Sequence, residues 1–299
     1  IQIVHARSYV PSVMALALKK IFGLKYIFDM RGFWADERVD GGLWPKGGRL
    51  YQVAKWFEQR FLLNADCVVS LTQTAIDEMR TFAYLQGRMP RFERITTCAD
   101  LNLFSPGKLE LSNADRYFTM GYVGSVGTWY LFDEVLRFFQ ILQARLPNAQ
   151  LHILNRGEHG FIQERLAALG IDSTRVKVET VDHTGVARAM QQMDAGIFFI
   201  KPTYSKKASA PTKLGEFLGC GVPCVSNVGV GDMADILENE GVGVVLKSFD
   251  VNALHEGVSR LINLAQRPGI RRRCREVALR YFSLEDGVRS YDRIYRSLV

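Results

Sequence analysis

The sequence predicts an α/β protein made of two doubly wound domains, each with a parallel sheet between layers of helices. Short apolar segments alternate with amphipathic ones along most of the chain, which is the pattern of strands and crossover helices in parallel sheets. A polar stretch with Pro and Gly, residues 105–116 (SPGKLELSNADR), interrupts this alternation and predicts a domain boundary. With 299 residues the chain is long enough for two hydrophobic cores.

The composition excludes several classes of protein. Hydrophobic residues make up 47% of the chain and charged residues 23%, which are ordinary globular values and exclude disorder for the bulk of it. No uncharged apolar run reaches about eighteen residues, so no segment is predicted to span a membrane. The five cysteines are an odd number scattered over a long chain, which favours a reducing compartment and predicts a cytoplasmic protein.

The formal net charge of +7 favours an anionic partner, whether a phosphate-bearing molecule, an acidic membrane face or nucleic acid. The densest basic cluster, Arg271–Arg273, lies in a helix-like segment with no aromatic residues between the arginines. A solvated helix face explains such a cluster, and nucleic-acid platforms require interleaved aromatic rings. We therefore predict no nucleic-acid partner.

Residues 1–108 predict a first domain with about four strands and no glycine-rich first turn. The chain opens directly on a buried strand, so we expect the native protein to begin before Ile1 and this domain to be incomplete. The expected elements are a strand at 1–5, a helix at 12–22 with Ser12 as N-cap, strands at 25–29, 67–71 and 94–97, a helix at 49–63, and a helix opened by Thr74 with Asp77 at capping-box spacing.

Residues 109–282 predict a complete doubly wound domain. The expected strands are 118–123, 150–154, 176–180, 196–200, 223–226 and 243–246, and the helices between them are 131–146, 161–169, 186–193 and 211–219. The remaining residues read as helices. The last of them, within 283–299, is predicted to pack back toward the first domain.

Residues 209–227 (SAPTKLGEFLGCGVPCVSN) predict a phosphate-binding helix terminus. Pro211 at the first helical position is preorganised for helix entry, and the free N–H groups of Thr212 and Lys213 behind it make an anion site. Glu216 follows one turn later, where a carboxylate can accept hydrogen bonds from two ribose hydroxyls. An ordinary helix-to-strand connection is the alternative interpretation of the same spacing.

A glycine-containing turn, residues 121–127 (GYVGSVG), follows a strand of the same domain. It is not the GxGxxG dinucleotide pattern, because its glycines recur every three positions. Ligands in open parallel sheets bind beyond the carboxyl ends of the strands, and both this turn and the helix after Pro211 lie there. We therefore predict a single cleft in which Gly124, Ser125 and Thr212 contact the ligand.

Three segments together resemble glycosyltransferases of family four: YVGSVGTWY (122–130), ASAPTKLGEFLGCGVP (208–223) and ITTCADLNLFSPG (95–107). In the third segment Asp100, Phe104 and Pro106 match the family pattern, whereas its Pro-Asn-Gly is missing. The resemblance covers most of the chain in order. It implies the GT-B fold, in which two Rossmann-like domains face each other, the first on the acceptor side.

The resemblance implies that the C-terminal domain binds a sugar nucleotide, with base and ribose over the later strands and the diphosphate at the helix after Pro211. The family carries two Glu eight positions apart. Glu216 matches the second, while the first falls on Ala208, next to the polar Ser209. The Arg and Lys that the family uses for the diphosphate are replaced here by Ser125 and an aromatic pair.

Another cation must then hold the diphosphate. Lys213 is the candidate catalytic cation, with Lys201, Lys206 and Lys207 in reserve. Cations and helix N–H groups offset the charge that develops on a departing nucleoside diphosphate. A helix terminus contributes about 0.3–2 kcal/mol and a charged hydrogen bond about 1.5–3, and together they accelerate the reaction by roughly thirty to a few thousandfold. An exposed helix lysine without a role is the alternative.

The acceptor side is predicted at the ends of the first two strands. His5 stands where the family carries a His facing the cleft, and Arg7 adds positive charge, so both are predicted as catalytic. A lone His is more often a satisfied structural residue, and this remains the alternative interpretation of His5. Asp29, Arg31 and Trp34 follow the second strand at the same edge of the sheet and are predicted to lie beside the acceptor.

No metal site is predicted. Cys220 and Cys224 have C-x3-C spacing but no partnering Cys or His cluster, and buried packing residues are the favoured interpretation. The histidines are dispersed along the chain. We predict that the protein needs no cofactor, the nucleotide sugar being a substrate.

The leading hypothesis is a metal-independent glycosyltransferase that moves a sugar from a nucleotide donor to a glycan or lipid-linked acceptor of the cell envelope. The resemblance implies retention, with the donor's departing phosphate taking the acceptor's proton on the same face. The basic surplus suits peripheral attachment to the anionic inner face of a membrane. A sugar-nucleotide epimerase of the same architecture and a non-catalytic sugar-nucleotide-binding partner are the alternatives.

Overall fold

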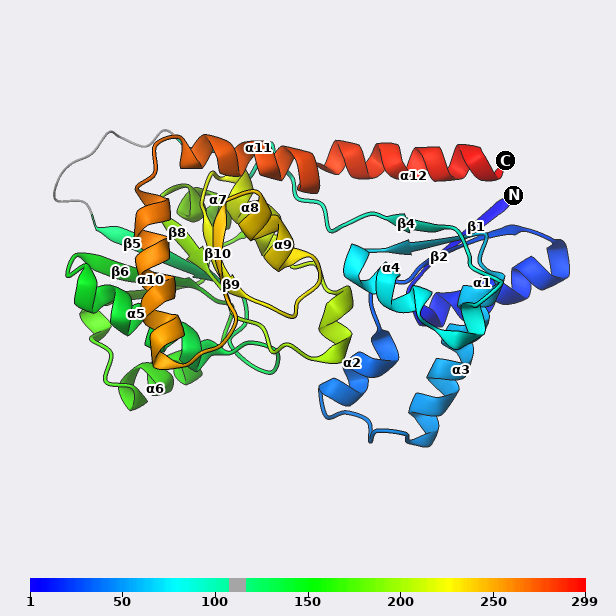
Figure 1. Ribbon diagram of the computed structural model, residues 1–299, viewed down its shortest axis with the longest axis horizontal. Helices are drawn as coiled ribbons and strands as arrows, with labels where there is room; N and C mark the ends of the chain where they lie inside the picture. Colours follow the sequence, from blue (N-terminus) through cyan, green and yellow to red (C-terminus); the bar gives the residue numbers. More distant parts are fainter. Residues whose placement is uncertain (108–116) are drawn as a thin grey trace.

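The computed structural model describes residues 1–107 and 117–299, so most of the predicted boundary segment 105–116 lies outside the described residues. Figure 1 shows two lobes side by side, each with a sheet flanked by helices. Within the described residues every strand pair of the two sheets is parallel. The predicted α/β class with two doubly wound domains is confirmed.

The described part of the N-terminal lobe has a four-stranded sheet in the order β1-β2-β3-β4. Its strands are β1 (Ile3–Arg7), β2 (Lys25–Asp29), β3 (Cys67–Ser70) and β4 (Phe92–Arg94). Its helices are α1 (Tyr9–Phe22), α2 (Trp34–Asp40), α3 (Arg49–Asn64) and α4 (Gln73–Arg80), followed by the 3₁₀ turn η1 (Ala83–Leu85). The sequence patterns did not predict α2.

Helix α1 begins earlier than predicted. It starts at Tyr9, and Ser12 is buried inside it instead of capping it. The Ser12 hydroxyl donates to the Ser8 carbonyl oxygen at 2.7 Å, one turn back along the helix. The predicted N-cap was therefore wrong.

The described residues of the C-terminal lobe form a six-stranded sheet in the order β10-β9-β8-β5-β6-β7, with the predicted number of strands. The strands are β5 (Phe118–Val123), β6 (Ala149–Leu154), β7 (Val176–Glu179), β8 (Ala195–Ile197), β9 (Cys224–Asn227) and β10 (Gly243–Leu246). The helices are α5 (Phe132–Arg145), α6 (His159–Ala168), α7 (His183–Gln191), α8 (Thr212–Gly219), α9 (Met233–Asn239), α10 (Val251–Ala265) and α11 (Ile270–Phe282), with 3₁₀ turns η2 (Ser173–Arg175) and η3 (Tyr204–Ala208).

The last helix, α12 (Leu284–Leu298), runs along the N-terminal lobe, as the red helix of Figure 1 shows. Its Ile294 packs with Ile27 and Val69 in one buried cluster. Successive residues of a strand face opposite sides of a sheet, so Tyr26 and Phe28 point the other way and pack with Phe61 of α3. The N-terminal sheet is thus covered by α12 on one face and by α1 and α3 on the other.

The segment that connects the lobes contributes to the second core. Leu101 and Phe104, which the sequence places in the first domain, are buried in the hydrophobic cluster of the C-terminal lobe. Among the described residues, no helix combines the length and the apolarity needed to cross a membrane.

The N-terminus of α4 is capped from both lobes. The Thr72 hydroxyl accepts from the Ala75 N–H at 3.1 Å, so Thr72 is the N-cap and the predicted capping by Thr74 was wrong. From the other lobe, the Asp232 carboxylate accepts from the Gln73 N–H at 2.7 Å and the Thr74 N–H at 2.9 Å. One carboxylate therefore neutralises the positive end of a helix in the opposite lobe.

We expect Asp232→Ala to lower the free energy of unfolding by about 1–2 kcal/mol, because it leaves two helix N–H groups without an acceptor. Urea unfolding followed by tryptophan fluorescence measures the change. Asp235→Ala, at an exposed position in the first turn of α9, is the matched control. Equal losses in the free energy of unfolding of the two variants would show that capping by Asp232 does not stabilise the contact between the lobes.

Candidate active site

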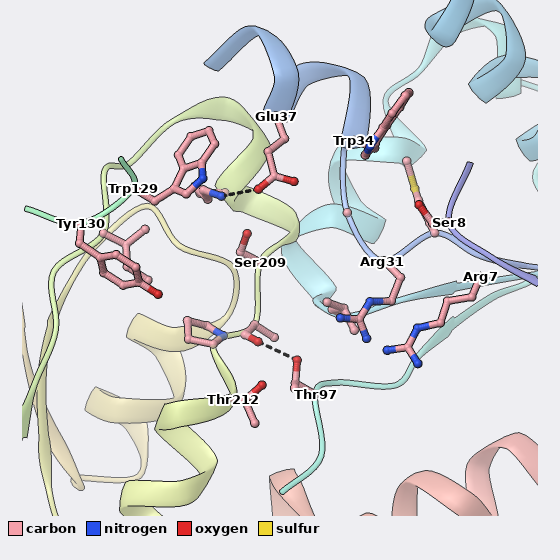
Figure 2. A pocket seen from close by; sticks show the side chains of 17 residues that line it. Arg7, Ser8, Arg31, Trp34, Glu37, Thr97, Trp129, Tyr130, Ser209 and Thr212 are labelled. Atoms are coloured by element: carbon pink, nitrogen blue, oxygen red, sulfur yellow. Dashed lines mark hydrogen bonds and ion pairs between the residues drawn. The ribbon is translucent and has the colours of Figure 1, made fainter. Parts of the chain in front are cut away.

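A cleft of about 670 Å³ lies between the two lobes. Its lining residues follow the carboxyl ends of β1, β2, β3 and β8, the edge at which open parallel sheets bind ligands. Figure 2 shows side chains from both lobes around it. The N-terminal lobe contributes Arg7, Ser8, Arg31, Trp34, Glu37 and Thr97, and the C-terminal lobe contributes Trp129, Tyr130, Lys206, Ser209 and Thr212.

The N-terminus of α8 opens onto this cleft through Pro211 and Thr212. Pro211 is extended, with φ −66° and ψ 120°, so the helix begins at Thr212, one residue later than predicted. The Thr97 hydroxyl of the other lobe donates to the Ala210 carbonyl oxygen at 2.6 Å and fixes the approach to the helix. The first N–H groups of α8 have no acceptor within the helix and carry partial positive charge, which favours an anion in the cleft.

The Lys213 side chain carries its ammonium group into a buried position behind that helix terminus, so the alternative interpretation of an exposed helix lysine was wrong. Its ammonium group has no hydrogen-bond partner among the described residues. It lies 4.2 Å from the ring centre of Tyr130 and 5.5 Å from that of Tyr122. Burial lowers the pKa of Lys213 to about 7, and the neighbouring carboxylate of Glu216 only partly opposes this shift. The amine is therefore poised to gain a proton when an anion arrives beside it.

A second cavity of about 300 Å³ lies in the C-terminal lobe and contains Gly124, Ser125, His183 and Glu216. Nε2 of His183 is 3.9 Å from Oε1 of Glu216. Burial raises the pKa of Glu216, and His183 and Lys213 act in the opposite direction. The structure thus separates the predicted donor-binding residues: Gly124, Ser125 and Glu216 line this cavity, whereas Ser209 and Thr212 line the cleft.

The Lys213 ammonium group lies close to Tyr130 of the cleft and to Gly124 of the smaller cavity. A Cβ atom added to Gly124 would come within 2.9 Å of the Lys213 Nζ, and Gly124 has φ +113°, which favours glycine. The hydroxyl of Ser125 donates to Glu158 at 2.9 Å, and the Val126 N–H donates to the same carboxylate at 3.1 Å. Since an internal carboxylate already accepts from this turn, the end of α8 is the stronger anion site.

The prediction that His5 faces the cleft was wrong. Strand β1 continues to Arg7, and alternation directs His5 to the face that α12 covers. His5 shares a hydrogen bond of 2.7 Å with the Tyr295 hydroxyl. The predicted acceptor-side placement of Asp29 was wrong for the same reason, because its carboxylate accepts from the Tyr291 hydroxyl at 3.0 Å. Neither His5 nor Asp29 lines the cleft.

Arg7, Arg31 and Trp34 do lie together on the N-terminal wall of the cleft (Figure 2). Arg7 ends β1 and Arg31 follows β2. Trp34 opens α2, and its ring packs edge-on against Trp44 with 5.1 Å between ring centres. The sequence predicted Arg31 and Trp34 from their positions after a strand, and Arg7 from its place beside the strand-end His of the resemblance.

Ala208, which replaces the first Glu of the resemblance, is buried in the hydrophobic cluster of the N-terminal lobe. The backbone oxygen of Ala208 would lie 3.8 Å from a Cβ built on Gly32, so the two lobes approach closely here. An ionised carboxylate at this position would enter an apolar core at a large cost in free energy. The small side chain therefore fits the way that the lobes pack.

Two of the three reserve lysines are paired with carboxylates of the N-terminal lobe. Lys206 lies 2.8 Å from Glu37, and Lys207 lies 2.7 Å from Glu78. Lys201 is exposed and does not line the cleft. Of the proposed cations, Lys213 is thus the one that is buried and lacks a hydrogen-bond partner within the described residues.

Residues 109–279 match the family described as glycosyl transferases group 1, and residues 1–91 match the glycosyl transferase 4-like domain. The first match covers more than half of the chain. This chain belongs to the group 1 glycosyltransferases. The resemblance to family four is thereby confirmed. No curated protein matches the sequence.

Solved structures similar to this glycosyltransferase have the GT-B fold. Sucrose-phosphate synthase from Thermosynechococcus elongatus has a TM-score of 0.76 at 18% identity, covering 99% of this chain and 73% of that one. A glycosyltransferase from Rickettsia africae has a TM-score of 0.72 at 14% identity, and the match covers 100% of this chain and 77% of that one. HepE from Anabaena in complex with UDP has a TM-score of 0.71 at 16% identity, and the match covers 99% of this chain and 78% of that one. The predicted GT-B architecture is confirmed.

Sequence reasoning missed several residues of this glycosyltransferase's site. His183, which the sequence analysis treated as one of the dispersed histidines, lies 3.9 Å from Glu216. The Glu158 carboxylate accepts hydrogen bonds from the glycine turn. Thr97 holds the loop before α8. His183 is the first residue of α7, so its place shortly after β7 was the available signal.

Among the described residues, no group of three or more His, Cys, Asp or Glu side chains is arranged to hold a metal ion. Cys220 and Cys224 are completely buried in the core of the C-terminal lobe, and burial raises the pKa of the Cys220 thiol to about 12. All five cysteines are free.

Proposed function

We propose that this glycosyltransferase transfers a sugar from a nucleoside diphosphate sugar to an acceptor bound in the cleft between the lobes. The observation that carries the proposal is the open end of α8 in that cleft, with the unpartnered amine of Lys213 behind it. Similar structures support a uridine nucleotide: HepE is described with UDP-glucose, and the pneumococcal transferase GtfA with UDP and GlcNAc.

In this arrangement the nucleoside occupies the smaller cavity, where Glu216 accepts from the ribose hydroxyls. The diphosphate lies against Thr212 at the end of α8, next to Lys213. The sugar then extends into the larger cleft, facing Arg7 and Arg31 of the other lobe. The two cavities and the lysine close to both support this division.

The proposed chemistry is electrostatic. As the bond between sugar and phosphate breaks, negative charge grows on the diphosphate, and the α8 N–H groups and the protonated Lys213 stabilise it. The departing phosphate oxygen then accepts the proton of the acceptor hydroxyl that attacks on the same face, so the configuration is retained. We propose that the reaction needs neither a metal ion nor a side-chain base.

The acceptor we propose is a glycan or a lipid-linked saccharide. The test is product analysis with UDP-glucose and UDP-GlcNAc, with and without a panel of such acceptors. We expect release of UDP that depends on the acceptor. Conversion of the donor sugar without any acceptor would identify an epimerase. Binding without turnover across the panel would identify a sugar-nucleotide-binding partner. Either result would overturn the proposal.

Glu216→Ala is expected to raise the Kd for UDP by about tenfold to a hundredfold, because a charged hydrogen bond contributes about 1.5–3 kcal/mol. Titration calorimetry measures the change. Glu276→Ala removes an exposed carboxylate from α11 in the same lobe and serves as the control. An unchanged Kd in Glu216→Ala would remove this residue from the ribose role.

A further inference from the structure

Two arginines on the N-terminal wall of the cleft have no hydrogen-bond or ion-pair partner among the described residues. Arg7 ends β1 and Arg31 follows the neighbouring parallel strand β2, and Figure 2 shows both side chains at the cleft. Each lacks a hydrogen bond or ion pair to any residue that the structure describes, whereas Lys206 and Lys207 are both paired. A guanidinium group presents a planar fork of donors that fits phosphate oxygens.

The charges that line the cleft do not balance. Its lining contains three cationic side chains, Arg7, Arg31 and Lys206, against one carboxylate, Glu37. Glu37 lies 2.8 Å from the Lys206 ammonium group, which also stacks 3.7 Å from the ring centre of Trp129. Of the positive charges that line the cleft, those of Arg7 and Arg31 therefore have no carboxylate within ion-pair distance among the described residues.

The backbone around these arginines is strained. Arg31 has φ +65° and Ser8, directly after Arg7, has φ +72°. Residues other than glycine rarely adopt this left-handed region, and such strain concentrates at ligand sites. The Ser8 N–H donates to the Asp29 carbonyl oxygen at 2.8 Å, and the Met30 N–H donates to the Val69 carbonyl oxygen at 3.0 Å. The sheet thus fixes the backbone next to both arginines, while their side chains are exposed.

We propose that Arg7 and Arg31 bind a phosphate group carried by the acceptor. This inference rests on the proposed function, which assigns the donor diphosphate to α8 and Lys213 on the opposite wall. A phosphate dianion matches the two unbalanced charges, and its oxygens can accept from both guanidinium forks. The acceptor is therefore a saccharide with two phosphate charges, either a phosphate monoester free in solution or a saccharide attached to a lipid through a diphosphate.

The test compares wild type with the double variant Arg7→Gln/Arg31→Gln. Arg88→Gln is the control, because Arg88 is an exposed arginine of the same lobe outside the cleft. Saturating UDP fills the donor site, and two probes are then titrated: glucose 1-phosphate, and phosphatidylcholine vesicles that contain phosphatidic acid. We expect the wild type to bind at least one probe. The double variant is expected to lose about tenfold or more in that affinity, with its affinity for UDP within about twofold of wild type.

The two probes distinguish a soluble from a lipid-linked source of the phosphate. Three results would overturn the inference. The wild type saturated with UDP binds neither probe, or the double variant binds the probes as tightly as Arg88→Gln does, or the double variant loses affinity for UDP instead, which would assign the arginines to the donor. If wild type fails to bind any nucleoside diphosphate, the proposed function itself fails. Thermal unfolding of each variant checks that it is folded.

Discussion

Lys213→Met is expected to lower turnover by about tenfold to a hundredfold while raising the free energy of unfolding. The loss of turnover follows because the variant lacks the charged hydrogen bond of about 1.5–3 kcal/mol to the departing diphosphate. The gain in stability follows because methionine has a similar shape and no buried amine without a hydrogen-bond partner. Leaving such a group unsatisfied costs about 1–3 kcal/mol. Steady-state kinetics and thermal unfolding measure the two effects.

The pH dependence of UDP affinity tests whether the charge of Lys213, as distinct from the shape of its side chain, is what binds the diphosphate. The pKa of Lys213 is lowered to about 7, so the amine is protonated below that pH and neutral above it. Because the diphosphate requires the cation, affinity for UDP should fall as the pH rises above 7, by up to about tenfold per pH unit. Lys213→Arg is expected to lose this dependence, since arginine stays protonated.

Stability changes with pH in the opposite sense. Between pH 7 and the pKa of an unfolded lysine, the unfolded chain binds one more proton at Lys213 than the folded protein does. The free energy of unfolding of the wild type therefore rises with pH across this window, and Lys213→Met should lose that slope. Lys247→Met, at an exposed lysine of the same lobe, is the control. An unchanged turnover and an unchanged slope would refute the role given to Lys213.

The largest expected loss of stability comes from Glu58→Ala in α3. The Glu58 carboxylate is completely buried and accepts from the Tyr9 hydroxyl and the Lys55 ammonium group. Burial raises the pKa of Glu58, and Lys55 opposes the shift. Removing one member of a buried ion pair costs about 3–5 kcal/mol. We expect about 2–4 kcal/mol here, because Lys55 is 26% exposed and keeps Asp36 at 3.0 Å.

Urea unfolding measures this loss. Glu93→Ala is the control, because it breaks an exposed ion pair with Arg91 in the same lobe, for which about 0–1 kcal/mol is expected. Glu58→Gln retains an acceptor for Tyr9 and should lose less than Glu58→Ala. Equal losses for Glu58→Ala and Glu93→Ala would mean that the buried cluster around Glu58 does not stabilise the N-terminal lobe.

The sequence predicted the strands of both sheets because their signals are local. An apolar run bounded by turn residues predicts a strand whatever the rest of the chain contains. At Lys25–Asp29 and Phe118–Val123 the predicted and observed strands coincide. Strand ends, in turn, predicted Arg7 and Arg31 in the cleft. Helix starts were less well predicted at Ser12 and Thr74, because several hydroxyl residues near each start were available as caps.

By itself the sequence determined the two parallel sheets, the family, and the helix terminus after Pro211, since periodicity and proline geometry act over a few residues. Only the tertiary structure decided which face of the first sheet is covered. Tyr295 reaches His5 from 290 positions away and removes it from the cleft. Likewise, the burial of Lys213 depends on rings contributed by several strands and loops. Burial and pairing are set by contacts between distant segments, which no local pattern encodes.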